Sequence, residues 1–98
     1  MEHRTDPAQV EHPRWCLKGN ICRVDGIHHS KPLAATTGDA HDAVRVWLEQ
    51  AWQLPDPSVV LESTVDGEVG YVYLPISQAR VLRHQLGRLL DAAKGGAR

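Results

Sequence analysis

The sequence predicts an α+β fold: an N-terminal loop rich in cysteine and histidine, a three- or four-stranded antiparallel meander, and one C-terminal helix packed on the sheet. Apolar and polar residues alternate along 44–49, and the runs 58–64 and 69–74 on either side of Asp66-Gly67 are typical of a β-hairpin. Leucines recur at three-and-four spacing along 77–93, as in an amphipathic helix. A chain of 98 residues has room for one such domain.

The two ends of the chain have the composition of solvated segments. We expect a flexible arm over 1–10, which is polar and aperiodic, a single domain over 11–94, and a flexible tail over 95–98. Three Trp, two Tyr and no Phe limit the core that this domain can build. A chain this short buries only about two-thirds of its unfolded surface, so an additional cross-link would help to stabilise it.

The N-terminal third predicts little regular structure. Turn-forming residues at Pro13, Gly19-Asn20 and Asp25-Gly26 indicate a loop over 12–29. Residues 30–37 could form a short extended segment.

The segment 44–53 is compatible with two structures. Its alternation and its β-branched residues favour a strand that ends near Gln53. A helix is the alternative, because Asp39 could cap it and an apolar stripe would end before Pro55. That stripe would comprise Ala40, Val44, Trp47, Leu48 and Ala51. We expect the strand.

Two further strand-like runs, 58–64 and 69–74, flank Asp66-Gly67. Asp-Gly tolerates the positive φ angles of tight hairpin turns, so these runs predict a β-hairpin. The helix over 77–93 follows, with Ser77 as its cap and Gly95 at its end. The side chains expected to pack on the sheet are Leu82, Leu86, Leu89, Leu90 and Ala93.

Both cysteines and three of the six histidines lie between His12 and His29. Thiolate sulfur and imidazole nitrogen are donors that zinc prefers, and four of them can close a tetrahedron. We expect one zinc ion per chain in a Cys2His2-type site, with three to five residues between successive donors. The spacing alone leaves His28 and His29 open as the fourth ligand. The expected set is His12, Cys16, Cys22 and His28.

The neighbours of Cys16 fit such a site. Trp15 could shield it from solvent, and backbone N–H groups near Gly19 and Asn20 could support the thiolate. The alternative is a disulfide or an inert pair of Cys16 and Cys22 with surface histidines. Iron–sulfur ligation is disfavoured, because the chain has only two thiols.

The block His12-Pro-Arg-Trp-Cys16 and the run Ile27-His28-His29-Ser30 resemble the opening of a group of small, uncharacterised actinobacterial proteins. These begin Cys-Pro-x-Trp-Cys, reach His-x-Ser before their β-strands, and end in a helix opened by Gln/Glu-Ala-Arg, like Gln78-Ala79-Arg80. This chain has His12 where the group usually has Cys, and Cys22 where the group often has His. Each difference replaces one zinc donor with another. By its offset from Ser30, the resemblance implies that His28 is the ligand. It implies a fold and a metal, but no activity.

Charge narrows the function classes. A net charge of −1 disfavours a generic nucleic-acid or membrane-surface binder. The charge is uneven, because residues 12–31 carry four basic side chains against one acid, 38–74 one against seven, and 76–98 five against one. We interpret these runs as solvated faces that complement one another, with a basic patch for an acidic partner as the alternative.

Four filled donor positions leave no open coordination site, so we expect a non-enzymatic interaction or regulatory module. Its partner would be another protein, and the contact would involve a sheet face with Trp47 and Tyr71 or Tyr73. The alternative is that these aromatic side chains form the core. One alternative is a zinc-knuckle-like nucleic-acid-binding protein that uses Arg14, Trp15, Lys18 and Arg23. A small zinc-dependent enzyme is the second alternative, although no catalytic motif occurs.

Hydropathy points to the cytoplasm. The first twenty residues lack the apolar stretch of a signal peptide, and no segment approaches the length of a membrane span. We therefore expect a cytoplasmic protein with no membrane partner.

Overall fold

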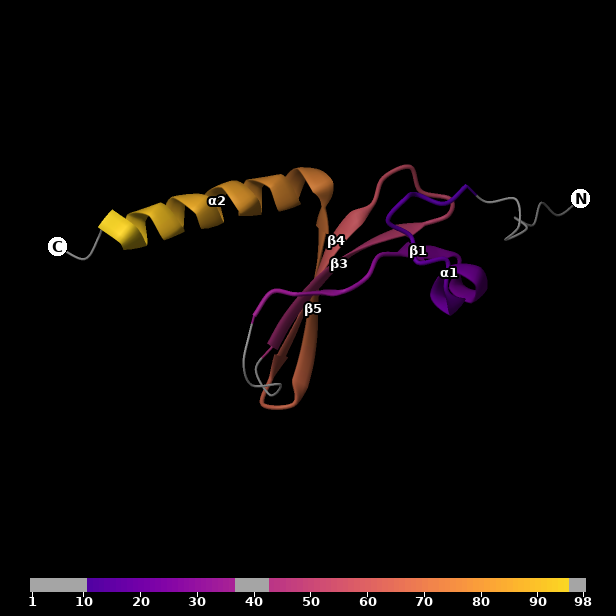
Figure 1. Ribbon diagram of the computed structural model, residues 1–98, viewed down its shortest axis with the longest axis horizontal. Coiled ribbons are helices and arrows are strands. Elements are labelled where there is room, and N and C mark those ends of the chain that lie inside the picture. Colours follow the sequence, from indigo (N-terminus) through magenta and orange to yellow (C-terminus); the bar gives the residue numbers. More distant parts are fainter. Residues whose placement is uncertain (1–10, 37–42, 96–98) are drawn as a thin grey trace, which may run out of the picture.

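The computed structural model describes residues 11–36 and 43–95. The predicted arm over 1–10 and residues 96–98 of the predicted tail lie outside these described residues. The α+β class is confirmed, with the elements in the order α1 (Asn20–Asp25), β1 (Ile27–His29), β2 (Leu33–Ala34), β3 (Ala43–Ala51), β4 (Ser58–Val65), β5 (Glu68–Pro75) and α2 (Ile76–Gly95) (Figure 1).

The sheet is antiparallel throughout, in the order β1-β3-β4-β5, with β2 also paired to β3. Strands β3, β4 and β5 form the predicted meander. Strands β1 and β2 pair with different parts of β3, with Ile27 opposite Ala51 and Leu33 opposite Val46. The gap between them is bridged at Ser30, whose N–H donates to the Leu48 carbonyl and whose hydroxyl accepts from the Leu48 N–H. The two short strands therefore extend the sheet and anchor the N-terminal loop to it.

The helical alternative for 44–53 is wrong, because residues 43–51 form strand β3. Its proposed cap, Asp39, lies outside the described residues. Strand periodicity sends Trp47 to one face of the sheet and Val46 and Leu48 to the other. A helix over these residues could not make the backbone pairing with β4 that is observed.

The hairpin between β4 and β5 forms as predicted. Asp66 and Gly67 take φ angles of 50° and 81°, and Val65 pairs with Glu68 across the turn. Positive φ at both central residues gives the turn the twist that matches the two strands.

Cross-strand register collects apolar side chains on one face of the sheet, which we call the apolar sheet face. Val46, Leu61 and Val72 form one row, and Leu48, Val59 and Leu74 form the next. None of these six side chains is fully buried.

The predicted helix is confirmed, but Ser77 lies inside it and is not its cap, and its predicted packing on the sheet is wrong. Helix α2 begins at Ile76, directly after the last residue of β5, and projects away from the sheet (Figure 1). Only Ile76 and Ala79 in its first turn are half-buried, and no residue of α2 is buried. With no linker after Pro75, the chain does not reverse onto its own sheet.

The core of the described residues is small. Its buried hydrophobic side chains are Cys16, Cys22, Trp47 and Val60, and His28 is buried with them. Trp47 therefore belongs to the core, whereas Tyr71 and Tyr73 are exposed. Three of these five buried side chains are expected metal donors, so the core depends on how those donors are satisfied.

Candidate metal centre

The turn before α1 positions His12 and Cys16. The Cys16 N–H donates to the Pro13 carbonyl at 3.0 Å, which folds the chain back within one turn. The next residue, Leu17, donates its N–H to the His29 carbonyl at 3.0 Å. This bond ties the turn to strand β1.

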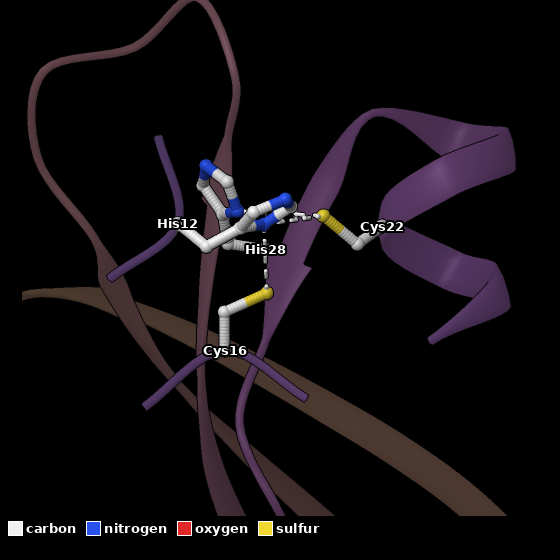
Figure 2. Close-up of side chains that lie close together, drawn as sticks. All are labelled: His12, Cys16, Cys22 and His28. Carbon is white, nitrogen blue, oxygen red and sulfur yellow. Dashed lines mark hydrogen bonds between the residues drawn. The ribbon is translucent and has the colours of Figure 1, made fainter. Parts of the chain in front are cut away.

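Helix α1 supplies Cys22, and strand β1 supplies His28. The helix ends at Gly26, whose φ of 68° is left-handed and whose N–H donates to the Cys22 carbonyl. Glycine adopts this conformation without the steric cost of a Cβ. The chain then reverses into β1, and His28 returns to a position beside Cys22 (Figure 2).

The four predicted donors meet in one cluster. The ligand atoms of His12, Cys16, Cys22 and His28 all lie within 4.8 Å of one another. His12 Nδ1 is 3.6 Å from Cys16 Sγ and 3.5 Å from Cys22 Sγ, and His28 Nδ1 is 3.4 Å from Cys22 Sγ (Figure 2). Tetrahedral zinc with ordinary Zn–S and Zn–N bonds would separate a sulfur from a nitrogen by about 3.6 Å. The observed spacings fit an ion at the centre.

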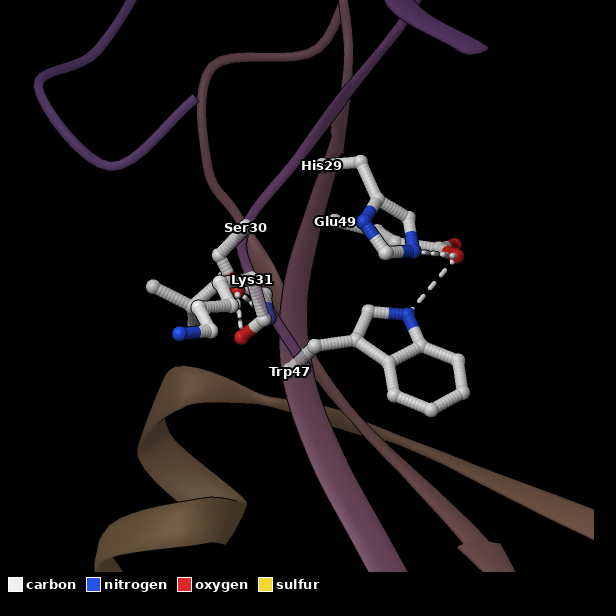
Figure 3. A network of polar contacts seen from close by, with 6 residues as sticks. His29, Ser30, Lys31, Trp47 and Glu49 are labelled. Atoms are coloured by element: carbon white, nitrogen blue, oxygen red, sulfur yellow. Dashed lines mark hydrogen bonds and ion pairs between the residues drawn. The ribbon is translucent and has the colours of Figure 1, made fainter. Parts of the chain in front are cut away.

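Strand geometry separates the two adjacent histidines. His28 is buried in the cluster, whereas His29 points to the opposite face of β1 and stacks on Trp47 with ring centroids 5.4 Å apart. The His29 Nε2 lies 3.9 Å from Glu49 Oε1, which also accepts the indole N–H of Trp47 (Figure 3). This placement puts His28, and not His29, beside the other three expected donors.

Two N–H groups donate to the thiol sulfurs. The Lys18 backbone N–H lies 3.3 Å from Cys16 Sγ, and the Trp52 indole N–H lies 3.2 Å from Cys22 Sγ. The first comes from Lys18, the residue before Gly19, close to where such donors were expected, and Lys18 has a positive φ of 57°. Such donors stabilise thiolate charge and orient a ligand.

Sequence reasoning missed Trp52. It follows the end of β3, and its backbone N–H donates to the Gly26 carbonyl at 2.9 Å. This bond continues the β1–β3 pairing and carries the indole to the cluster. The sequence offers only a weak signal, a tryptophan just after a predicted strand, because the contact depends on long-range register.

Aromatic rings enclose His28. The Trp15 and Trp52 rings each lie 6.3 Å from the His28 ring, measured between centroids. The predicted shielding by Trp15 therefore has a second contributor. His12 is half-buried, and a pocket lined in part by Glu11, His12 and Trp52 opens on this side.

Burial alters the acid–base properties of the donors. Removal from water raises the pKa of the Cys22 thiol, and the indole N–H of Trp52 opposes this change in part. Burial lowers the pKa of His28, and nearby His12 lowers it further. These pKa shifts favour a neutral thiol at Cys22 and a neutral imidazole at His28, and a divalent cation would displace the thiol proton.

The fold and cluster define a class: a small α+β domain with a His2Cys2 group that could bind a metal ion. Cys16 and Cys22 are free thiols, so the structure contains no disulfide between them. No protein-family profile, curated protein or solved structure matches the chain. Among the described residues, no helix has both the length and the hydropathy to cross a membrane.

Proposed function

We propose that this protein is a zinc-binding, non-enzymatic interaction module that holds one zinc ion per chain in a structural site. The donor geometry of His12, Cys16, Cys22 and His28 is the observation that carries the proposal. Two thiolates balance the charge of a zinc ion, and the pair of imidazoles completes a tetrahedron. Oxygen-preferring magnesium and calcium suit this donor set poorly.

A closed site favours a structural role over a catalytic one. Catalytic zinc keeps a coordination position for water or substrate, whereas four protein donors fill a tetrahedral ion. The buried state of Cys16, Cys22 and His28 supports this interpretation, because a substrate would have to displace a core side chain.

The size of the core supports the same conclusion. Zinc binding in zinc-finger peptides contributes about 10–16 kcal/mol at neutral pH. The net stability of a whole domain is about 5–15 kcal/mol. With only five buried side chains among the described residues, zinc binding would contribute a free energy as large as the net stability of a whole domain.

Native mass spectrometry of freshly reduced protein tests the proposal. We expect the mass of one chain plus one zinc ion, and loss of that ion in the Cys16→Ser/Cys22→Ser variant. The matched control is His29→Ala, which removes an adjacent histidine on the opposite face and should keep the metal. A wild-type protein without metal after expression and titration with zinc would contradict the proposal.

In this proposal the protein acts in the cytoplasm by binding another protein. Large apolar side chains on the sheet and on α2 are exposed, among them Val72 and Leu86. Such surfaces mark interaction sites in soluble proteins.

Nucleic-acid binding is the second candidate, because Arg14, Lys18 and Arg23 are exposed around the cluster. The acidic strands and the net charge of −1 count against it. Titration with single-stranded and duplex oligonucleotides at several salt concentrations tests this candidate. Binding through phosphate contacts should weaken steeply as the salt concentration rises, and binding without this dependence would exclude the candidate.

A further inference from the structure

Strand β5 is an open edge of the sheet. It is the last strand in the order β1-β3-β4-β5 and pairs with β4 alone. At the other end of the sheet, the N-terminal loop covers β1, because the Leu17 N–H donates to the His29 carbonyl. Among the described residues, nothing pairs with the outer side of β5. Its backbone is therefore available to a second molecule.

The hairpin turn determines which backbone groups of β5 point outward. The two-residue turn at Asp66-Gly67 has positive φ at both positions, so the flanking Val65 and Glu68 form a hydrogen-bonded pair. Bonding alternates along an antiparallel pair, so every second residue from Glu68 onward bonds to β4. The residues whose N–H and C=O groups point outward are Val69, Tyr71 and Tyr73.

The position of Pro75 supports this assignment. Proline lacks an N–H, and within sheets it occupies edge positions where that group would face solvent. Pro75 continues the alternation of Tyr71 and Tyr73, so its missing N–H would lie on the outer side. The pairing of β5 with β4 therefore loses no donor at Pro75.

The open edge lacks the features with which natural sheets prevent further pairing. Such features are short edge strands, charged side chains, proline and bulges. Strand β5 has eight residues and pairs with β4 without a bulge. Its one charged residue and its one proline, Glu68 and Pro75, lie at its two ends. The middle of β5 is thus a template for an additional strand.

The side chains of the outward residues are also uncovered. Val69, Tyr71 and Tyr73 share one face of the sheet and are 52%, 52% and 59% exposed. On the interior strand β4, by contrast, Val60 lies opposite Tyr73 and is 0% exposed. A strand beside β5 would cover these three side chains as β5 helps to cover Val60.

We propose that the protein forms a homodimer in which the β5 strands of two copies pair antiparallel across a two-fold axis at Tyr71. In this register Tyr71 faces Tyr71 of the other copy, and Val69 faces Tyr73. Among two-fold registers, this one alone pairs the outward N–H and C=O groups of these three residues entirely with one another. One continuous sheet then runs through both copies.

The side chains of β5 favour a second copy as the partner. Pairs of two aromatic residues, or of an aromatic and a β-branched residue, stabilise antiparallel sheets, and this register makes both kinds. On the other face, Val72 lies opposite Gly70 of the other copy, which has no side chain to crowd it. Glu68 lies opposite Leu74, so no like charges meet.

Helix α2 begins only after the last paired residue and projects away from its own sheet (Figure 1). The dimer goes beyond the proposed function and does not depend on the metal.

Sedimentation velocity of the full metal-loaded chain, over a range of concentrations, is the first test. We expect a dimer of 10.9 kDa chains. Tyr71→Pro should weaken it by about tenfold or more, because it removes a backbone donor at the centre of the pairing from both copies. Tyr71→Val is the matched control, since it also removes the phenol ring but keeps the N–H. It should retain most of the affinity.

Circular dichroism and zinc content show which variants fold. If Tyr71→Pro does not fold, Tyr71→Lys takes its place, because it sets two like charges opposite each other at the axis. Its control is Leu86→Lys, since Leu86 is 50% exposed on α2 and lies outside the proposed contact. A monomer at every concentration, or a dimer that tolerates the Tyr71 variants, would overturn the proposal. Loss of the dimer with zinc retained would leave the proposed metal site intact.

Hydrogen exchange followed by NMR tests the geometry residue by residue. The amides of Val69, Tyr71 and Tyr73 should exchange more slowly as the protein concentration rises. Those of Gly70 and Val72 should be protected at every concentration, because they bond to β4. A dimer in which the three outward amides gain no protection would contradict the proposed pairing.

Discussion

The indole N–H of Trp52 donates to the sulfur of Cys22 at 3.2 Å, across 30 residues of sequence. This contact joins the end of β3 to the metal cluster, so the cluster and the sheet support each other. A hydrogen bond from a neutral donor to a thiolate stabilises the charged form that a metal requires.

Replacement of Trp52 by Phe should weaken metal binding. Loss of an outer-shell partner typically costs about 10–100-fold in metal affinity, and we expect a loss in that range. Competition with a chromophoric chelator measures it. Trp15→Phe is the control, because the Trp15 ring contacts His28 edge-on and keeps its aromatic character in this variant. Equal affinities of the two variants would exclude a role for the indole N–H.

The adjacent histidines should differ in their effect on the metal. His28→Ala removes a buried donor, so we expect loss of tight zinc binding and of the cooperative thermal transition. His29→Ala removes a ring that stacks on Trp47, which costs about 1 kcal/mol and keeps the metal. Zinc content and thermal unfolding of both variants test this pair. The opposite ranking would place the fourth ligand at His29.

Gly26 should be sensitive to substitution for a backbone reason. Its φ of 68° costs an L-residue about 1–2 kcal/mol, whereas an added Cβ would meet the Trp52 ring only at 3.8 Å, an ordinary contact. We therefore expect Gly26→Ala to lower the free energy of unfolding by about 1–2 kcal/mol in urea denaturation. Gly19→Ala is the control, because Gly19 has a φ of −87° and no atoms within 4 Å of an added Cβ. Equal effects would show that the turn after α1 tolerates a side chain.

The ion pair of Arg45 and Glu62 predicts a dependence on pH. The Arg45 Nε–H donates to Glu62 at 2.7 Å and lowers the pKa of that carboxyl below its usual 4.5. A lowered carboxyl pKa stabilises the folded state above the unfolded value, and this contribution is lost as the pH falls through the folded value. The stability difference between wild type and Glu62→Gln should therefore shrink between pH 6 and pH 3. A difference that grows on acidification would contradict the pairing.

Much of this molecule follows from local pattern. The alternation in β3 predicted a strand, and Asp66-Gly67 predicted the hairpin turn that the φ angles confirm. The clustering of cysteine and histidine predicted the four side chains that the structure brings together. Each of these features depends on residues that are near in sequence.

The features that sequence did not predict depend on distant contacts. Strand β1 has only three residues and exists through its pairing with β3, so its composition carries no strand signal. Trp52 reaches Cys22 through that same pairing. The leucines of α2 recur at helical spacing, which predicts an apolar contact, but the spacing alone does not show that the contact is with the sheet of the same chain. The resemblance to small actinobacterial proteins stays a prediction.

X-ray absorption at the zinc edge, on reduced protein loaded with one equivalent of zinc, tests the metal site most directly. We predict two sulfur neighbours at about 2.3 Å and two nitrogen neighbours at about 2.0–2.1 Å, with no water oxygen. A first shell of nitrogen and oxygen alone, or one with a single sulfur, would contradict a closed site built from His12, Cys16, Cys22 and His28.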